Sequence, residues 1–250
     1  MSSQVHEAAV LFGRNVRALR GRGLIAPVVN PLIFFGAFYL VLHRALAARG
    51  IDFGVFFPPG VVVASAGALA IGAAQATARD RRNGLFTRYR TMPIRTGSIL
   101  AGRLACDVLP AAISALVVVA AGLLIGFRFH AGVLSAICFV LLAVAFNVAL
   151  AAGTGVVGLR ARQTEAVASM LFVLFLPLIN FSGAFVPVKD FPGWLQPLVR
   201  FSPFTAVAQA LRALSAGGPV TAVVWHALAW VVGLAVLFCW LAARAFRRVA

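Results

Sequence analysis

The sequence is poor in charged residues, and acidic residues are the scarcest of them. Only 11% of its 250 residues are charged and six residues are acidic, whereas 62% are hydrophobic. A soluble domain carries about 25% charged residues because its surface faces water. Less than half of that proportion leaves too little polar surface to cover a globule. The composition therefore excludes an ordinary soluble domain and predicts a single membrane domain over residues 1–250.

The sequence also lacks the motifs by which proteins commonly bind nucleotides or cleave substrates. It has no GxxxxGK[ST] phosphate-binding loop, no GxSxG and no HExxH. Its four histidines and three cysteines are scattered singly, without the spacing of metal ligands or of a disulfide framework. We therefore expect no catalytic site, no metal and no cofactor bound by this chain.

Long apolar runs are what the sequence does contain. A membrane helix needs about 20 mainly apolar residues, and lipid offers no hydrogen-bond partners to an open backbone. The predicted fold class is therefore all-α, with six transmembrane helices. The six predicted segments are 24–43, 55–78, 99–126, 133–158, 166–186 and 219–243.

The 22 basic residues fall between these runs, a placement that argues against nucleic-acid binding and instead indicates the orientation in the membrane. Basic residues near a membrane concentrate on its cytoplasmic side. With the N-terminus inside, sixteen basic residues lie on the inner side and six on the outer side. Both termini are therefore predicted to be cytoplasmic.

Before the first crossing, apolar residues recur at four- and three-residue steps, which predicts a helix over residues 1–23. Arg14 and Arg17 lie on its opposite face. Such a helix lies flat at the lipid interface with its arginines toward anionic head groups, and a disordered basic tail is the alternative. The apolar positions are Val5, Ala9, Phe12, Val16 and Leu19.

Residues 79–97 are the predicted cytoplasmic loop after the second crossing. Asn83-Gly84 is a turn signal and Pro93 is a helix stop, with room for a short helix between them. Four large apolar groups would share one side of that helix, which favours a docking surface for a soluble partner over a face resting on lipid. These groups are Leu85, Phe86, Tyr89 and Met92.

The outer connection, residues 187–218, is too rich in proline to be a spanning helix. Ser202 is a predicted N-cap with Pro203 at the first helical position, and the helix stops at Gly217-Gly218-Pro219. Because about 13 residues cannot span a bilayer, we predict a short re-entrant helix that dips into the outer leaflet.

Asp107 is the acidic residue that falls inside a predicted crossing. It follows Arg103 by four residues, so the two share a helix face. An interfacial ion pair between them is the favoured interpretation. A proton relay is the alternative, although such a relay would use further acids deep in the bilayer.

Two stretches of the sequence resemble the type-2 ABC permeases, specifically the daunorubicin/doxorubicin-resistance-like branch. The first is the loop from Arg79 to Arg95, with Asn83-Gly84-Leu85 and Met92-Pro93-Ile94. The second is more specific, because several glycines, prolines and a tryptophan keep their order and spacing. It comprises FSGAFVP at 181–187, FPGWLQP at 191–197, SPFT at 202–205 and LRAL at 211–214.

This resemblance implies the permease subunit of an ATP-binding-cassette exporter in the plasma membrane of a bacterium, and not an enzyme. The implied partners are a second copy of the permease or a similar chain, two ATPase subunits that hold ATP and magnesium, and membrane lipids. The cargo would be an amphipathic drug, antibiotic or lipid, moved outward when ATP binding closes the ATPase dimer and rocks the two permease halves.

The family's ATPase contacts carry over to the flat N-terminal helix and the first cytoplasmic loop. Arg88 stands where many members have an acid, so the apolar face is the stronger part of this expectation. The implied contact residues are Phe12, Val16, Leu19, Asp80, Arg81, Leu85, Phe86, Arg88, Tyr89, Met92, Pro93 and Ile94. The residues proposed for the substrate path are Phe34, Phe35, Phe38, Asn180 and Phe181. The alternative, which is the commoner role of aromatic residues there, is plain packing or lipid-facing groups.

Two other functions stay open at this point. One is a polysaccharide or glycolipid permease of the same superfamily, which the short outer loops and the drug-branch motif disfavour. The other is an ion-coupled secondary transporter that uses Asp107.

Overall fold

The computed structural model describes the backbone of residues 25–47, 53–85, 96–161, 163–217 and 221–249. Within these ranges every regular element is a helix and no strand occurs, which confirms the all-α fold class. The elements are α2 (Ile25–Ala47), α3 (Phe53–Arg82), α5 (Thr96–Leu124), α6 (Gly132–Arg160), α7 (Thr164–Asn180), the 3₁₀-helix η2 (Val188–Asp190), α8 (Gln196–Phe201), α9 (Pro203–Ala216) and α10 (Thr221–Val249).

Each predicted crossing segment coincides with one helix: α2, α3, α5, α6, α7 or α10. Four helices in the described residues are long and apolar enough to cross a membrane, namely Gly54–Arg82, Ala101–Leu124, Gly132–Arg160 and Ala222–Ala245. The apolar parts of α2 and α7 are shorter, at Ile25–Val41 and Thr164–Asn180. The chain is therefore a multi-pass membrane protein, and the count of six crossings stays a prediction.

The fifth predicted segment, 166–186, extends too far toward its C-terminal end. Helix α7 ends at Asn180, with Pro177 in its last turn and the Phe181 N–H donating to the Pro177 carbonyl. Beyond that point the backbone turns, because the next carbonyls are bonded by a side chain of another helix, as described below. The apolar character of residues 181–186 had masked this turn.

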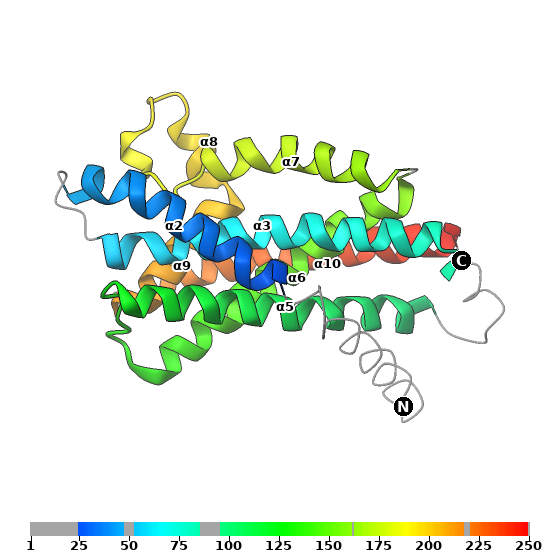
Figure 1. Ribbon diagram of the computed structural model, residues 1–250, viewed down its shortest axis with the longest axis horizontal. Helices are drawn as coiled ribbons and strands as arrows, with labels where there is room; N and C mark the ends of the chain where they lie inside the picture. The colour runs from blue at the N-terminus through cyan, green and yellow to red at the C-terminus, as the bar shows by residue number, and fades with distance from the viewer. Residues whose placement is uncertain (1–24, 48–52, 86–95, 162, 218–220, 250) are drawn as a thin grey trace.

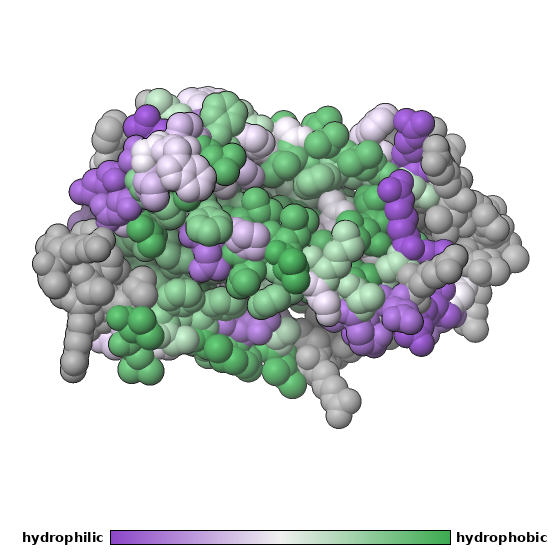
Figure 2. All heavy atoms as spheres, turned by 90° about the horizontal axis from the view of Figure 1, so that it is seen from above, coloured by the Kyte–Doolittle hydropathy of each residue, from purple (hydrophilic) through white to green (hydrophobic). Residues whose placement is uncertain are grey.

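The long helices lie side by side along the longest axis of the molecule, and their connections gather at its two ends (Figure 1). One end holds the last turns of α3 and α6 and the start of α7. We call it the arginine-rich end, after Arg79, Arg81 and Arg82 of α3 and Arg160 of α6. Figure 2 shows apolar surface across the middle of the molecule and hydrophilic residues toward both ends, as a hydrocarbon layer about 30 Å thick requires.

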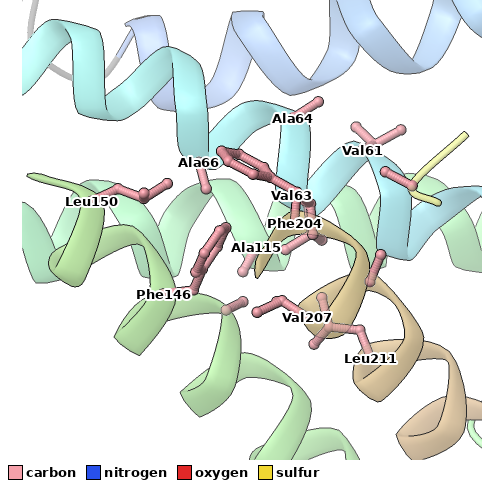
Figure 3. Close-up of a cluster of buried hydrophobic side chains, with 14 of the residues drawn as sticks. Val61, Val63, Ala64, Ala66, Ala115, Phe146, Leu150, Phe204, Val207 and Leu211 are labelled. Carbon is pink, nitrogen blue, oxygen red and sulfur yellow. The ribbon is translucent and has the colours of Figure 1, made fainter. Parts of the chain in front are cut away.

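Helix α3 lies at the centre of the bundle. It packs against α2, α5, α6, α7 and α9. The apolar middle of α3 is largely buried, whereas most of that of α10 is exposed at the surface of the chain. Side chains from α3, α5, α6 and α9 form the buried cluster of Figure 3. The residues labelled there are Val61, Val63, Ala64, Ala66, Ala115, Phe146, Leu150, Phe204, Val207 and Leu211.

The closest seam in the bundle joins α3 to α6. A Cβ atom added at Gly158 would overlap the backbone carbonyl of Ala74, so only glycine permits this approach. Two side chains of α6 donate hydrogen bonds across the seam, Asn147 to the Ala66 carbonyl at 3.2 Å and Thr154 to the Ala70 carbonyl at 2.7 Å. Such bonds between membrane helices are worth roughly 0.6 kcal/mol each. Close packing therefore contributes much of the stability of the seam.

The short helix α9 is packed inside the protein. Its 14 residues begin after the N-cap Ser202 with Pro203 in the first turn, and they end at Gly217, whose φ is 73°. Both ends agree with the sequence prediction, although the Ser202 hydroxyl makes no capping bond. The helix packs against α3, α6 and α10. A helix too short to span is thus buried by protein, which covers its ends from lipid.

Several expectations from the sequence lie outside the described residues. They are the interfacial helix over 1–23 with Phe12, Val16 and Leu19, and the part of the coupling loop with Phe86, Arg88, Tyr89, Met92, Pro93 and Ile94. The turn at Asn83 and Gly84 is described, and Gly84 has a φ of 68°.

Candidate functional site

A narrow groove runs between α2, α3 and α7, and we call it the α2–α7 groove. It encloses about 70 Å³ and is lined almost entirely by apolar side chains. Phe34, Phe38 and Asn180, three of the five residues expected along the substrate path, lie on its walls. The other lining residues are Ala64, Gly67, Ala68, Ile71, Phe172, Phe175, Leu176, Ile179 and Phe185.

The remaining two path residues lie elsewhere. Phe35 is buried in the core, where its ring meets Phe57 edge to face at a centroid distance of 5.7 Å. Phe181 is 54% exposed and does not line the groove. Successive residues of a helix point in different directions, so Phe34 and Phe38 share the groove face while Phe35 does not.

An aromatic stack closes the groove beside the turn after α7. The ring of Phe38 lies on that of Phe185 with 4.5 Å between centroids and 8° between planes. Phe57 contacts both rings, at 5.8 Å from Phe38 and 5.7 Å from Phe185. Aromatic pairs of this kind contribute about 0.5–1.5 kcal/mol beyond their buried area. The stack therefore fastens α2 and α3 to the segment that follows α7.

Arg212 of α9 forms hydrogen bonds with the same turn. Its guanidinium donates to the carbonyls of Phe56 at 3.0 Å and Gly183 at 2.7 Å, and to that of Ala184. It also lies over the Phe56 ring, 3.7 Å from the centroid. Desolvation lowers the pKa of Arg212 below its usual value, while three carbonyl acceptors and a ring face all favour the charged form.

Small residues let the turn reach these partners. A Cβ atom at Gly60 of α3 would overlap the Ala184 carbonyl oxygen, and one at Gly183 would crowd Thr205 of α9. The Gly183 N–H also donates to the Thr205 hydroxyl at 2.9 Å. The FSGAF segment at 181–185 is therefore hydrogen-bonded to α9 and packed closely against α3, and both contacts require small residues in it.

At the arginine-rich end, side chains tie the last turns of α3 to its neighbours. Arg103 of α5 forms a salt bridge with Asp80 at 2.7 Å and donates to the Ala73 carbonyl at 2.8 Å. Arg81 donates to the Leu159 carbonyl at the end of α6. Asp80 and Arg81 belong to the predicted loop, 79–97, but the structure places them in the last turn of α3, which runs to Arg82. The turn at Asn83 and Gly84 therefore starts from a braced helix end.

Arg103, predicted to pair with Asp107, forms its salt bridge with Asp80. Within the described residues, no salt bridge joins Arg103 to Asp107. The two residues lie on one turn of α5, but Asp80 and the Ala73 carbonyl of α3 both bind the guanidinium. The partner of Arg103 is thus set by the packing of α5 against α3 and not by the four-residue spacing along α5. The sequence alone does not reveal which helices touch.

The described residues form a helix bundle with an apolar groove and a braced end. Among these residues, no group of three His, Cys, Asp or Glu side chains could hold a metal ion. Such a bundle can bind and guide apolar molecules. These features define a polytopic α-helical membrane protein with a packed short helix near one end. The family model described as "ABC-2 type transporter" matches residues 8–215, and the chain belongs to this family.

Curated relatives of the chain carry names from drug resistance. A daunorubicin resistance ABC transporter permease protein, DrrB1 of Streptomyces coeruleorubidus, is 31% identical over 90% of this chain and 79% of its own length. A doxorubicin resistance ABC transporter permease protein, DrrB of Mycobacterium tuberculosis, is 30% identical over 91% of this chain and 86% of its own. A probable doxorubicin resistance permease, DrrC of the same species, is 27% identical over 86% and 78%. The chain is accordingly a permease of the ABC transporter class.

Sequence reasoning missed Arg212 as the residue that organises this site. Arg212 is one of the six basic residues predicted on the outer side, and its place in the LRAL part of the family motif is the signal that singles it out. An arginine flanked by Leu211 and Leu214, both buried, on a short apolar helix has to satisfy its donors inside the protein. The distant carbonyls that accept them could not be named without the fold.

Proposed function

We propose that this chain is the membrane subunit of an exporter that moves an amphipathic drug, antibiotic or lipid outward with ATP hydrolysed by a separate subunit. Two permease chains and two ATPase subunits form the proposed assembly, with both termini of the permease in the cytoplasm of a bacterium. ATP and magnesium stay with the ATPase. The family membership and the relatives' names support the class, and the groove supports the kind of cargo.

The observation that carries this proposal is the α2–α7 groove. Its walls are aromatic and aliphatic, with Asn180 as the polar residue among them. A volume of about 70 Å³ is far below the 300–1,000 Å³ of typical small-molecule sites. We therefore assign the groove to a closed state, in which the Phe38–Phe185 stack and the Arg212 contacts seal the side away from the arginine-rich end.

Motion from the ATPase would enter at the arginine-rich end. Asp80 and Arg81 are bonded to α5 and α6, so a push on the loop that follows them moves three helices together. Helix α3 also lines the groove through Ala64, Gly67, Ala68 and Ile71. A displacement of α3 along or across the bundle would thus change the groove directly.

A bulky residue in the groove tests the proposed path. Ala68→Phe should reduce transport of the drug by the purified assembly at least tenfold, because the ring fills a space already small. Basal ATPase activity should remain, since the substitution lies far from the docking end. Ala222→Phe, on an exposed part of α10, is the matched control. Full transport by the Ala68→Phe variant would show that the groove is not part of the transport path.

A charge at the start of the coupling loop tests the proposed docking. Leu85→Asp should abolish co-purification of the ATPase subunit or uncouple its ATP hydrolysis from transport, while thermal unfolding of the permease stays unchanged. Retained coupling in this variant would place the docking face elsewhere on the protein.

The ion-coupled alternative keeps one observation in its favour, because Asp107 makes no salt bridge with Arg103 within the described residues. Uptake or efflux driven by a proton gradient without ATP, and lost in Asp107→Asn, would support it. ATP-dependent transport that survives Asp107→Asn would dismiss it.

A further inference from the structure

A second cavity, much larger than the α2–α7 groove, opens at the arginine-rich end between the last turns of α6 and the first turns of α7. It encloses about 640 Å³. Its lining residues are Val156, Val157, Arg160, Ala161, Gln163, Ala166, Val167 and Met170. Nothing in the proposed transport path uses these residues, and we call the cavity the α6–α7 pocket.

The α6–α7 pocket lies on the other flank of α7 from the α2–α7 groove. Val167, Leu171 and Phe175 mark the buried face of α7, at steps of four residues. Ala166 and Met170 fall to one side of this face and line the pocket, whereas Phe172, Leu176 and Ile179 fall to the other side and line the groove. The two spaces are therefore separate sites that share one helix.

Polar groups of the α6–α7 pocket gather at its membrane-surface end and favour negative charge. Arg160, the last residue of α6, is exposed and lines the pocket, as does Gln163. Helix α7 starts at Thr164 without a side-chain cap, so the positive end of its dipole is open to an anion. The Thr164 hydroxyl, beside the pocket but not among its lining residues, is buried without a hydrogen-bond partner. Glu165 does not line the pocket.

The rest of the pocket is apolar and faces the depth of the membrane. Val156 and Val157 precede Arg160 by about one turn of α6, and Val167 and Met170 lie in the first and second turns of α7. A cation at the surface with aliphatic walls beneath it matches a molecule with an anionic head and hydrocarbon chains. The volume lies within the range of small-molecule sites, about 300–1,000 Å³. Anionic phospholipids are the abundant molecules of this kind at a membrane surface.

We propose that the α6–α7 pocket is a binding site for one anionic phospholipid of the leaflet at the arginine-rich end. The head-group phosphate pairs with Arg160 and the open amides at the start of α7, and the acyl chains lie against Val157, Ala166 and Met170. This proposal does not rest on the proposed export function, because a permease of any cargo could hold such a lipid.

Native mass spectrometry of the full chain, purified with its accompanying subunits from bilayers of equal dioleoyl-phosphatidylglycerol and dioleoyl-phosphatidylcholine, tests the site. The wild type should retain one phosphatidylglycerol per chain in preference to phosphatidylcholine. Arg160→Gln should lower this preference about tenfold, as expected for a lost charge-assisted contact. Arg200→Gln, which removes an exposed arginine of α8, should leave it unchanged.

A second variant tests the apolar walls. Ala166→Phe should displace the retained lipid whatever its head group, and Val157→Phe should do the same from the opposite wall if the first variant folds poorly. Equal retention of the two lipids by the wild type would overturn the proposal. The proposal would also be overturned if Arg160→Gln kept the wild-type preference for phosphatidylglycerol. Retention of the lipid by both Ala166→Phe and Val157→Phe would overturn it too.

Discussion

At the scale of single residues, Arg212 does most to define this protein. One guanidinium bonds carbonyls of α3 and of the turn after α7, and it covers the Phe56 ring. Without it, three backbone carbonyls at Phe56, Gly183 and Ala184 would each lose a donor inside the protein. A charged hydrogen bond is worth about 1.5–3 kcal/mol, and an unsatisfied buried acceptor costs a similar amount.

Arg212→Ala is therefore expected to lower the free energy of unfolding by roughly 2–4 kcal/mol. Denaturant-induced unfolding in detergent or bicelles measures this loss. Arg212→Lys should recover part of it, since an ammonium can serve fewer carbonyls and stacks less well. Arg200→Ala, on the exposed face of α8, is the control. A loss below about 0.5 kcal/mol, the size of an ordinary surface change, would show that the clamp is unimportant.

The Asp80–Arg103 bridge is the second interaction that belongs to this scale. Its side chains are 36% and 22% exposed, so water screens it and its contribution is modest. A double-mutant cycle with Asp80→Asn and Arg103→Gln should give a coupling of about 0.5–1 kcal/mol. The coupling should shrink in high salt. A matching cycle with Asp107→Asn and Arg103→Gln should give a smaller coupling energy. If the Asp107–Arg103 coupling were the larger of the two, the pairing expected from the sequence would be the correct one.

At the scale of whole elements, the seam between α3 and α6 determines how the bundle is assembled. Glycine at 158 brings the two helices into backbone contact, and the polar bonds of Asn147 and Thr154 fix their register. Asn147 joins two helices, as polar residues inside membrane helices commonly do. The sequence does not single out Gly158, because many glycines in an alanine-rich membrane helix look alike.

Gly158→Val should force α3 away from α6 and lower the free energy of unfolding by about 3 kcal/mol or more, because its Cβ meets backbone that cannot yield. Gly72→Ala on α3 is the matched control. A Cβ there meets nothing within 4 Å, so this change should be neutral or slightly stabilising. Equal effects of the two substitutions, measured by thermal unfolding, would argue against the tight seam.

The sequence predicted the helices well and their contacts poorly. Apolar length alone placed α2, α3, α5, α6, α7 and α10, and the Ser202-Pro203 and Gly217 signals placed the ends of α9. The end of α7 was missed because residues 181–186 are as apolar as a helix. Phe34, Phe38 and Asn180 line one groove, whereas Phe35 lies in the core and Arg103 forms its salt bridge with Asp80 of α3. These placements depend on which helices meet, and apolar length along the chain does not reveal that.

At the scale of the whole molecule, the two ends differ in what holds them. The arginine-rich end is braced by bonds from Asp80, Arg81 and Arg103 around the start of the predicted coupling loop. The other end is sealed by aromatic rings and by Arg212. Helix α3 runs between them through the core. Under the proposed function, motion that enters at the arginine-rich end would reach the other end through α3.

The central claim is that ATP spent by a separate subunit drives export through this chain. Drug transport into inside-out proteoliposomes, containing the permease with its ATPase partner, tests it most directly. The account predicts transport that requires ATP, stops when the ATPase is catalytically inactive, and is absent with the permease alone. Undiminished transport by the permease alone, powered by a proton gradient, would contradict the account.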